Sequence, residues 1–176
     1  MNINLKDGRR INLYVDEEKN IVIFPISKTK ETVQLSDGTV AYKYHTAYFP
    51  IELKVPYTAE QLAEKIEYGI EQWNCHECYK YFSGRNTFEE KYYGIKGFKN
   101  AIKGKVFLSL GYDEYDGKYV KLFAPMKRGY AYYMMAKKEL FEDADWIDFA
   151  NAVIELMNAD IVALGKKMQV LKSLNL

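Results

Sequence analysis

The chain has 176 residues, of which 48% are hydrophobic and 28% are charged, and its formal net charge is +1. This size and composition are typical of one globular domain, so we expect residues 1–176 to fold as a single unit. A near-neutral chain lacks the basic excess of a typical nucleic-acid-binding protein, and no run reaches the ~20 apolar residues that a membrane helix needs. The polar first ten residues contain no apolar core of signal-peptide length, which predicts a cytoplasmic protein without disulfides.

The first third of the chain is predicted to form β structure. Short runs rich in β-branched, aromatic or alternating apolar residues predict strands at 11–15, 21–26, 32–35, 39–44 and 47–55. The first two runs flank a polar turn, which is typical of a hairpin. Pro25 is expected near a strand end or on a sheet edge, because it has no N–H to donate.

Two capped amphipathic helices are predicted to provide most of the helical packing surface. Thr58 is followed three residues later by Gln61, which is a capping-box signal ahead of an apolar stripe and predicts a helix over 58–74. Asp143 or Asp145 is expected to cap a later helix, with an apolar stripe of Trp146, Phe149, Val153, Leu156 and Met157.

Shorter helices and further strands complete the predicted elements. Short helices are expected at 87–93, after a capping signal at Thr87 and Glu90, and at 96–103, and another amphipathic stretch runs over 161–174. Additional strands are predicted at 105–111, 118–124 and 129–137. The order of elements favours an α+β fold: a mostly antiparallel sheet with two main amphipathic helices and shorter helices packed on it, on one face.

The segment Cys75-His76-Glu77-Cys78 is the first candidate for chemistry. A Cys-x-x-Cys pair supplies half of a zinc site, and His45 is the other histidine of the chain. However, adjacent ligands in so short a loop are geometrically awkward. The pair also follows the predicted end of a helix, whereas redox pairs precede a helix. Two ordinary cysteines near a helix end are therefore the favoured interpretation.

Other candidates for catalysis have simpler structural explanations. His45 is a possible general base, but a lone histidine between two β segments is more often a turn or surface residue. The carboxylates of Asp113, Glu114 and Asp116 belong to a hairpin turn, and those of Glu142, Asp143 and Asp145 belong to a helix start. The chain has no nucleophile elbow and no glycine-rich phosphate loop. We therefore predict no catalytic, cofactor-binding or metal-binding residues, and no cofactor.

The most specific segment is Tyr93-Gly94-Ile95-Lys96 together with the elements that follow it. A short helix comes next, then a strand, an Asp116-Gly117 turn, a strand that ends at Pro125, and a capped helix from Asp145. In this order of elements, the region 48–158 resembles the immunity proteins of bacterial contact-dependent growth inhibition systems. Gly97 departs from the family pattern, in which a more polar residue is expected.

The resemblance implies a non-enzymatic, cytoplasmic protein that binds the C-terminal domain of a toxin, usually a nuclease, delivered by a neighbouring cell, and that blocks its active site. It implies neither a membrane nor a nucleic acid as a partner. Because such a nuclease is often basic, an acidic partner face is expected, and an exposed sheet edge is a further way to pair with a toxin strand. The candidate partner-binding residues are Tyr92, Tyr93, Lys96, Lys99, Asp113, Glu114 and Asp116.

Two other classes of function stay open. The first is a non-enzymatic binding or scaffold module for a nucleic acid or a small molecule. Its binding surface would be a patch of lysines with aromatic residues between them: Lys91, Lys96, Lys99, Lys103 and Lys105. The second is an enzyme, in which His45 or the Cys75–Cys78 pair would act.

Overall fold

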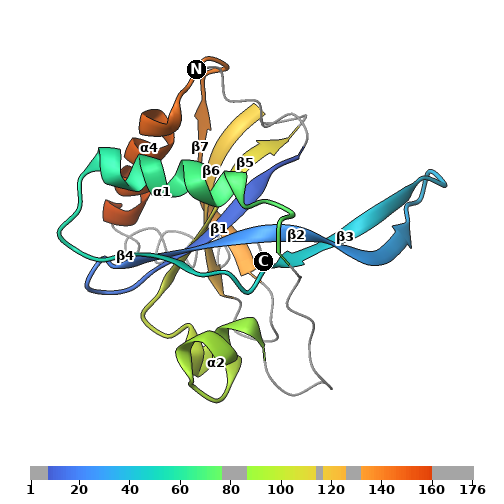
Figure 1. The fold of residues 1–176 in the computed structure, drawn as a ribbon, viewed down its shortest axis with the longest axis horizontal. Coiled ribbons are helices and arrows are strands. Elements are labelled where there is room, and N and C mark those ends of the chain that lie inside the picture. The colour runs from blue at the N-terminus through green and yellow to red at the C-terminus, as the bar shows by residue number, and fades with distance from the viewer. Residues whose placement is uncertain (1–7, 77–86, 114–116, 126–131, 160–176) are drawn as a thin grey trace, which may run out of the picture.

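The protein is an α+β structure built on one antiparallel sheet, as predicted (Figure 1). The computed structural model describes residues 8–76, 87–113, 117–125 and 132–159. The elements of these residues are β1 (Arg10–Val15), β2 (Ile21–Gln34), β3 (Val40–Thr46), β4 (Ile51–Leu53), α1 (Ala59–Glu71), α2 (Phe88–Tyr93), α3 (Phe98–Ala101), β5 (Val106–Asp113), β6 (Gly117–Pro125), β7 (Tyr132–Leu140) and α4 (Trp146–Asn158). The strand order is β3-β2-β1-β5-β6-β7, and β4 also pairs with β2.

The sheet has apolar side chains on both faces. In β1, Ile11 and Leu13 belong to the main core with α1 and α4, whereas Tyr14 belongs to a second core with α2 and α3. In β2, Ile23 and Phe24 divide in the same way, because successive side chains of a strand point to opposite faces. The expectation that the helices share one face is therefore correct for α1 and α4 but wrong for α2 and α3 (Figure 1).

Helix α1 begins where its cap predicts. The Thr58 hydroxyl accepts a hydrogen bond from the Gln61 backbone N–H, and the Gln61 side chain accepts one from the Thr58 N–H. The helix ends at Glu71, shorter than the predicted range, and its stripe of Leu62, Ile66 and Ile70 is buried against the sheet.

Helix α4 has the same kind of start. Asp145, one of the two candidate caps, accepts from the Asp148 N–H, and Asp148 accepts from the Asp145 N–H. Phe149 and Val153 of its predicted stripe are fully buried in the main core. The amphipathic stretch predicted at 161–174 lies outside the described residues.

The two predicted short helices are both present. Helix α2 has the predicted capping box between Thr87 and Glu90, and it ends at Gly94, which adopts a left-handed conformation with φ of 66°. Helix α3 covers four residues, fewer than predicted. Because Phe88 and Phe98 are buried against the same side of the sheet, these two helices cover its second face.

The strand boundaries differ from prediction mainly in β2. This strand has 14 residues and joins the two strands predicted at 21–26 and 32–35, whereas the strand predicted at 47–55 shrinks to Ile51–Leu53. Strands β5, β6 and β7 occur near their predicted positions, and β7 is displaced by three residues to 132–140.

Pro25 lies inside β2 instead of at the expected strand end. It sits between the residues that pair with β4 (21–23) and those that pair with β3 (26–34). Its carbonyl accepts from the Ala47 N–H at 2.9 Å, and the Ala47 carbonyl accepts from the Phe49 N–H at 2.9 Å. A backbone N–H at residue 25 would point at the Ala47 carbonyl oxygen, which already accepts from Phe49. The missing N–H of proline therefore costs no hydrogen bond here.

Candidate functional site

The second half of β2, the turn after it and β3 form a two-stranded arm, residues 28–46, that projects from the body of the protein (Figure 1). Every residue from 30 to 40 is exposed, on both faces of the arm. None of the residues 28–46 belongs to either apolar core or packs against one. The arm therefore contributes little to the packing of the body and is available as a surface.

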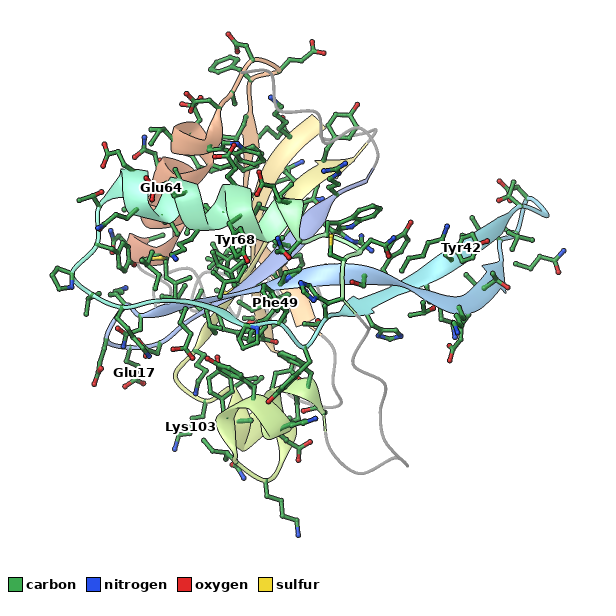
Figure 2. The ribbon with its side chains drawn as sticks, in the orientation of Figure 1. Glu17, Tyr42, Phe49, Glu64, Tyr68 and Lys103 are labelled. Atoms are coloured by element: carbon green, nitrogen blue, oxygen red, sulfur yellow. The ribbon has the colours of Figure 1, made fainter. Side chains whose placement is uncertain are left out.

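Apolar side chains gather on this arm. Of the eleven exposed large hydrophobic side chains among the described residues, five belong to the arm: Val33, Leu35, Val40, Tyr42 and Tyr44. Figure 2 shows Tyr42 on the arm, away from the helices of the body. Exposed apolar groups that cluster in this way are typical of protein interaction sites.

Strand β3 is the terminal strand of the sheet, so nothing in the described part of the chain pairs with its outer edge. The Ala47 N–H points toward β2, where it reaches Pro25, and at the other end of β3 Thr39 accepts from the Leu35 N–H at 2.8 Å. Backbone groups of an antiparallel strand alternate in direction along it. The N–H and C=O groups of Val40, Tyr42, Tyr44 and Thr46 therefore point outward and can pair with another strand.

Two cations lie over the tyrosine rings of β3. The Lys28 Nζ is 3.4 Å from the centroid of the Tyr42 ring, and the Arg10 guanidinium carbon is 5.3 Å from that of Tyr44. The Tyr44 ring also stacks with Trp73, with 6.2 Å between centroids and 27° between the planes. Cation–π contacts of this kind hold a positive charge in a fixed place on the surface.

A pocket of about 280 Å³ lies at the base of the arm, on the sheet face that carries Tyr14 and Phe24. The residues that line it include two with aromatic rings, Tyr44 and Phe107, and two with basic side chains, Arg10 and His45. The described residues that line it include no carboxylate. The pocket is thus suited to an uncharged or anionic group.

The aromatic residues predicted to bind a partner, Tyr92 and Tyr93, are half-buried in the second core. The Tyr92 ring meets Phe24 edge-on at 5.1 Å, and the Tyr93 ring meets Tyr14 edge-on at 6.3 Å. The Tyr92 hydroxyl donates to Glu52 Oε1 at 2.5 Å, and burial, followed by this bond, raises the Tyr92 pKa. Both residues hold α2 on the sheet.

The basic and acidic members of the predicted set lie apart. Lys96 and Lys99 are exposed around α3, which precedes β5, whereas Asp113 is the last residue of β5 and pairs with Gly117. An eight-residue strand spans roughly 23 Å, so the backbone of Asp113 lies at the end of β5 far from α3. Glu114 and Asp116 lie outside the described residues.

The cysteine and histidine candidates do not assemble into a site in the part of the chain that the structure describes. Cys75 is exposed after the end of α1, as predicted, with its Sγ 3.4 Å from the Glu71 carbonyl oxygen. The His76 ring stacks on Phe49 with 3.9 Å between centroids. Glu77 and Cys78 are not among the described residues, and no group of three or more metal-ligating side chains occurs among those that are.

The remaining candidates are surface and capping groups. His45 is exposed on β3, opposite Ser27, at the rim of the pocket. Asp145 caps α4, and Glu142 and Asp143 are exposed in the loop before it.

No sequence motif predicted the arm or the cations above it. Residues 30–34, Lys-Glu-Thr-Val-Gln, contain a single apolar residue, so they have no apolar side to bury against a core. That signal, next to the alternating Val40, Tyr42 and Tyr44, distinguishes a projecting strand from a core strand.

Comparisons with protein-family models, with curated proteins and with solved structures found no match to this chain. No helix of the described residues is long and apolar enough to cross a membrane.

Proposed function

We propose that the protein is an immunity protein that binds the C-terminal toxin domain encoded next to it and blocks the toxin's active site. The observation that supports this proposal most is the arm: an exposed, two-stranded projection with apolar side chains, a strand edge with which no described residue pairs, and no part in the core of the described residues. The order of elements from Tyr93 to α4, which resembles that of immunity proteins, supports the same class.

The arm offers two kinds of contact to a protein partner. The free edge of β3 supplies main-chain hydrogen bonds for an added strand, a recurrent mode of peptide recognition. Tyr42 and Tyr44, which are 46% and 36% exposed, supply large side chains of the type that dominates binding energy at interfaces. The seven residues of β3 extend over roughly 20 Å, long enough for the arm to enter an enzyme cleft and exclude its substrate.

The experiment is coexpression with the toxin domain encoded directly upstream. Wild-type protein is expected to restore growth and to copurify with the toxin domain. A variant in which a short Asn-Gly turn replaces residues 30–42 is expected to fold and to lose both properties. The double variant Lys96→Glu/Lys99→Glu tests the two lysines predicted from the sequence to bind the partner, and it is expected to keep both properties if the arm is the binding surface. Failure of the wild type to bind or to restore growth would contradict the proposal.

A second candidate is a nucleic-acid-binding module, which is favoured by the exposure of Lys96, Lys99 and Lys103 in and beside α3. Binding of this kind weakens steeply with salt. A salt-dependent gel shift with single-stranded RNA that Lys96→Glu/Lys99→Glu abolishes would support this candidate over the first.

A further inference from the structure

We infer that the arm receives an acidic, extended strand, with carboxylates on alternate residues that bind Lys28 and Arg10. This inference deepens the proposed function and rests on it, because it states the chemistry of the partner segment that binds at β3. It differs from the expectation of an acidic surface facing a basic toxin, since the face of β3 that would contact this strand is basic.

The two cations share one face of the edge strand. Tyr42 and Tyr44 are two residues apart on β3, so their side chains point to the same face of the arm. Lys28 lies over the first ring and Arg10 over the second. Lys28 from β2 and Arg10 from β1 therefore place two positive charges against neighbouring rings on one face of β3.

Neither cation has an acidic partner in the described part of the chain. No ion pair involves Lys28 or Arg10 there, and their charges meet only the tyrosine rings. A positive charge on a ring is already partly ordered, so less conformational entropy is lost when a carboxylate binds it. A carboxylate also accepts charge-assisted hydrogen bonds, which are stronger than neutral ones.

The same face carries no carboxylate of the arm itself. The register places Lys28 opposite Tyr44, Thr32 opposite Tyr42 and Gln34 opposite Val40.

The acidic residues of the arm are engaged elsewhere. Glu31 forms an ion pair with Lys43, which alternation places on the opposite face from Tyr42 and Tyr44. Asp37 accepts hydrogen bonds from Thr39 in the turn, and these bonds lower the Asp37 pKa. An incoming carboxylate at the Lys28 face thus meets attraction without repulsion from the arm.

The spacing fits a strand. Alternate residues of a strand lie about 6.6 Å apart on one face, and a paired strand lies about 4.8 Å from its neighbour. Carboxylates at positions i and i+2 of the added strand therefore fall beside Tyr42 and Tyr44, on the face where Lys28 from β2 and Arg10 from β1 lie over these rings. Cross-strand pairs of opposite charge stabilise pairing, and like charges oppose it.

The test uses capped peptides of about ten residues and amide resonances of the whole protein. One peptide alternates valine with aspartate, and its match alternates valine with lysine, so that the two carry opposite charges at the same positions. The aspartate peptide is expected to shift the amide resonances of Val40, Tyr42, Tyr44 and Thr46 and the Arg10 Nε resonance. The lysine peptide is expected to leave them unchanged.

Charge reversals locate the site. Lys28→Glu or Arg10→Glu is expected to weaken binding of the aspartate peptide by about tenfold or more. Lys43→Glu changes the same charge on the opposite face of the arm, and it is expected to weaken binding by less than about twofold.

Three results would overturn the inference: no shifts with the aspartate peptide, equal shifts with both peptides, or an equal effect of Lys43→Glu and Lys28→Glu. The toxin domain is absent from this assay, so its outcome is independent of the growth-rescue experiment. A protein that restores growth but ignores the aspartate peptide keeps the proposed function and loses this inference.

Discussion

The Tyr92 hydroxyl donates a 2.5 Å hydrogen bond to Oε1 of Glu52, and this bond joins α2 to β4 across 40 residues of sequence. We expect Tyr92→Phe to lower the free energy of unfolding by about 1 kcal/mol, because it removes the bond and keeps the ring contacts. Urea denaturation at neutral pH measures the change. Tyr68→Phe is the control, since the Tyr68 hydroxyl has no hydrogen bond among the described residues. Equal stability of Tyr92→Phe and wild type would contradict this role.

The same bond predicts a dependence on pH. Burial and the Glu52 hydrogen bond raise the pKa of Tyr92 in the folded protein above its ordinary value of 10.0. Above about pH 10 the unfolded chain therefore releases this proton while the folded chain retains it, so stability falls as pH rises. The stability difference between wild type and Tyr92→Phe should be constant well below pH 10, begin to shrink near about pH 10, and shrink further as the pH rises above it. Urea denaturation of both proteins measures it, and a constant difference would argue against this linkage.

Lys118 offers a test of a buried polar contact. Its side chain is only 6% exposed, and its Nζ donates to the Ala144 carbonyl oxygen at 2.8 Å, which fixes the loop before α4. We expect Lys118→Met to lower stability by about 1–2 kcal/mol, because methionine replaces the apolar stem and leaves the carbonyl without its donor. Lys103→Met, at an exposed position, should change stability by less than about 0.5 kcal/mol. Thermal or urea denaturation compares the two variants.

Two buried glycines should respond differently to alanine. A Cβ at Gly111 would lie 2.8 Å from the backbone oxygen of Arg9, which cannot move without shifting β1. A Cβ at Gly69 would lie 3.0 Å from the γ2 methyl group of Ile23, so this side chain has to move by only a few tenths of an ångström, and alanine favours the helix by about 1 kcal/mol. We therefore expect Gly111→Ala to lower stability by about 2 kcal/mol and Gly69→Ala to change it much less. If denaturation experiments show a larger loss of stability for Gly69→Ala than for Gly111→Ala, β1 accommodates an added methyl group more readily than Ile23 does.

The arm predicts a separation of stability from binding. Tyr42→Ala should change the free energy of unfolding by less than about 0.5 kcal/mol, because Tyr42 touches neither core. The same substitution should weaken binding of the toxin domain by at least about tenfold. Phe24→Ala, in the second core, is the opposite case and should cost about 3–5 kcal/mol. Calorimetry of binding and of unfolding measures both quantities, and a large loss of stability in Tyr42→Ala would show that the arm supports the body.

Local signals in the sequence predicted the fold well where they act within a few residues. The capping pairs Thr58–Gln61 and Thr87–Glu90 each satisfy backbone groups at a helix start, and both occur as predicted. The polar turn between β1 and β2 is equally local, and the hairpin around it was correct.

Features that depend on distant contacts were less accessible. The position of Pro25 depends on the hydrogen bonds of Ala47 and Phe49, about 22 residues away. The hydrophobic periodicity of the sequence carries no information about these bonds. Whether Tyr92 and Tyr93 face a partner or a core depends on their ring contacts with Tyr14 and Phe24, which come from strands distant in the sequence. The cations above β3 depend on the register of three strands, and no motif of adjacent residues encodes it.

The exclusion of residues 28–46 from both cores has a consequence for how such a protein changes over generations. Substitutions on the arm alter what it recognises while the core that determines folding stays intact. A chain with this design can follow a changing partner by small steps, each of which yields a folded protein. Related chains are therefore expected to share the body and to differ most along the arm.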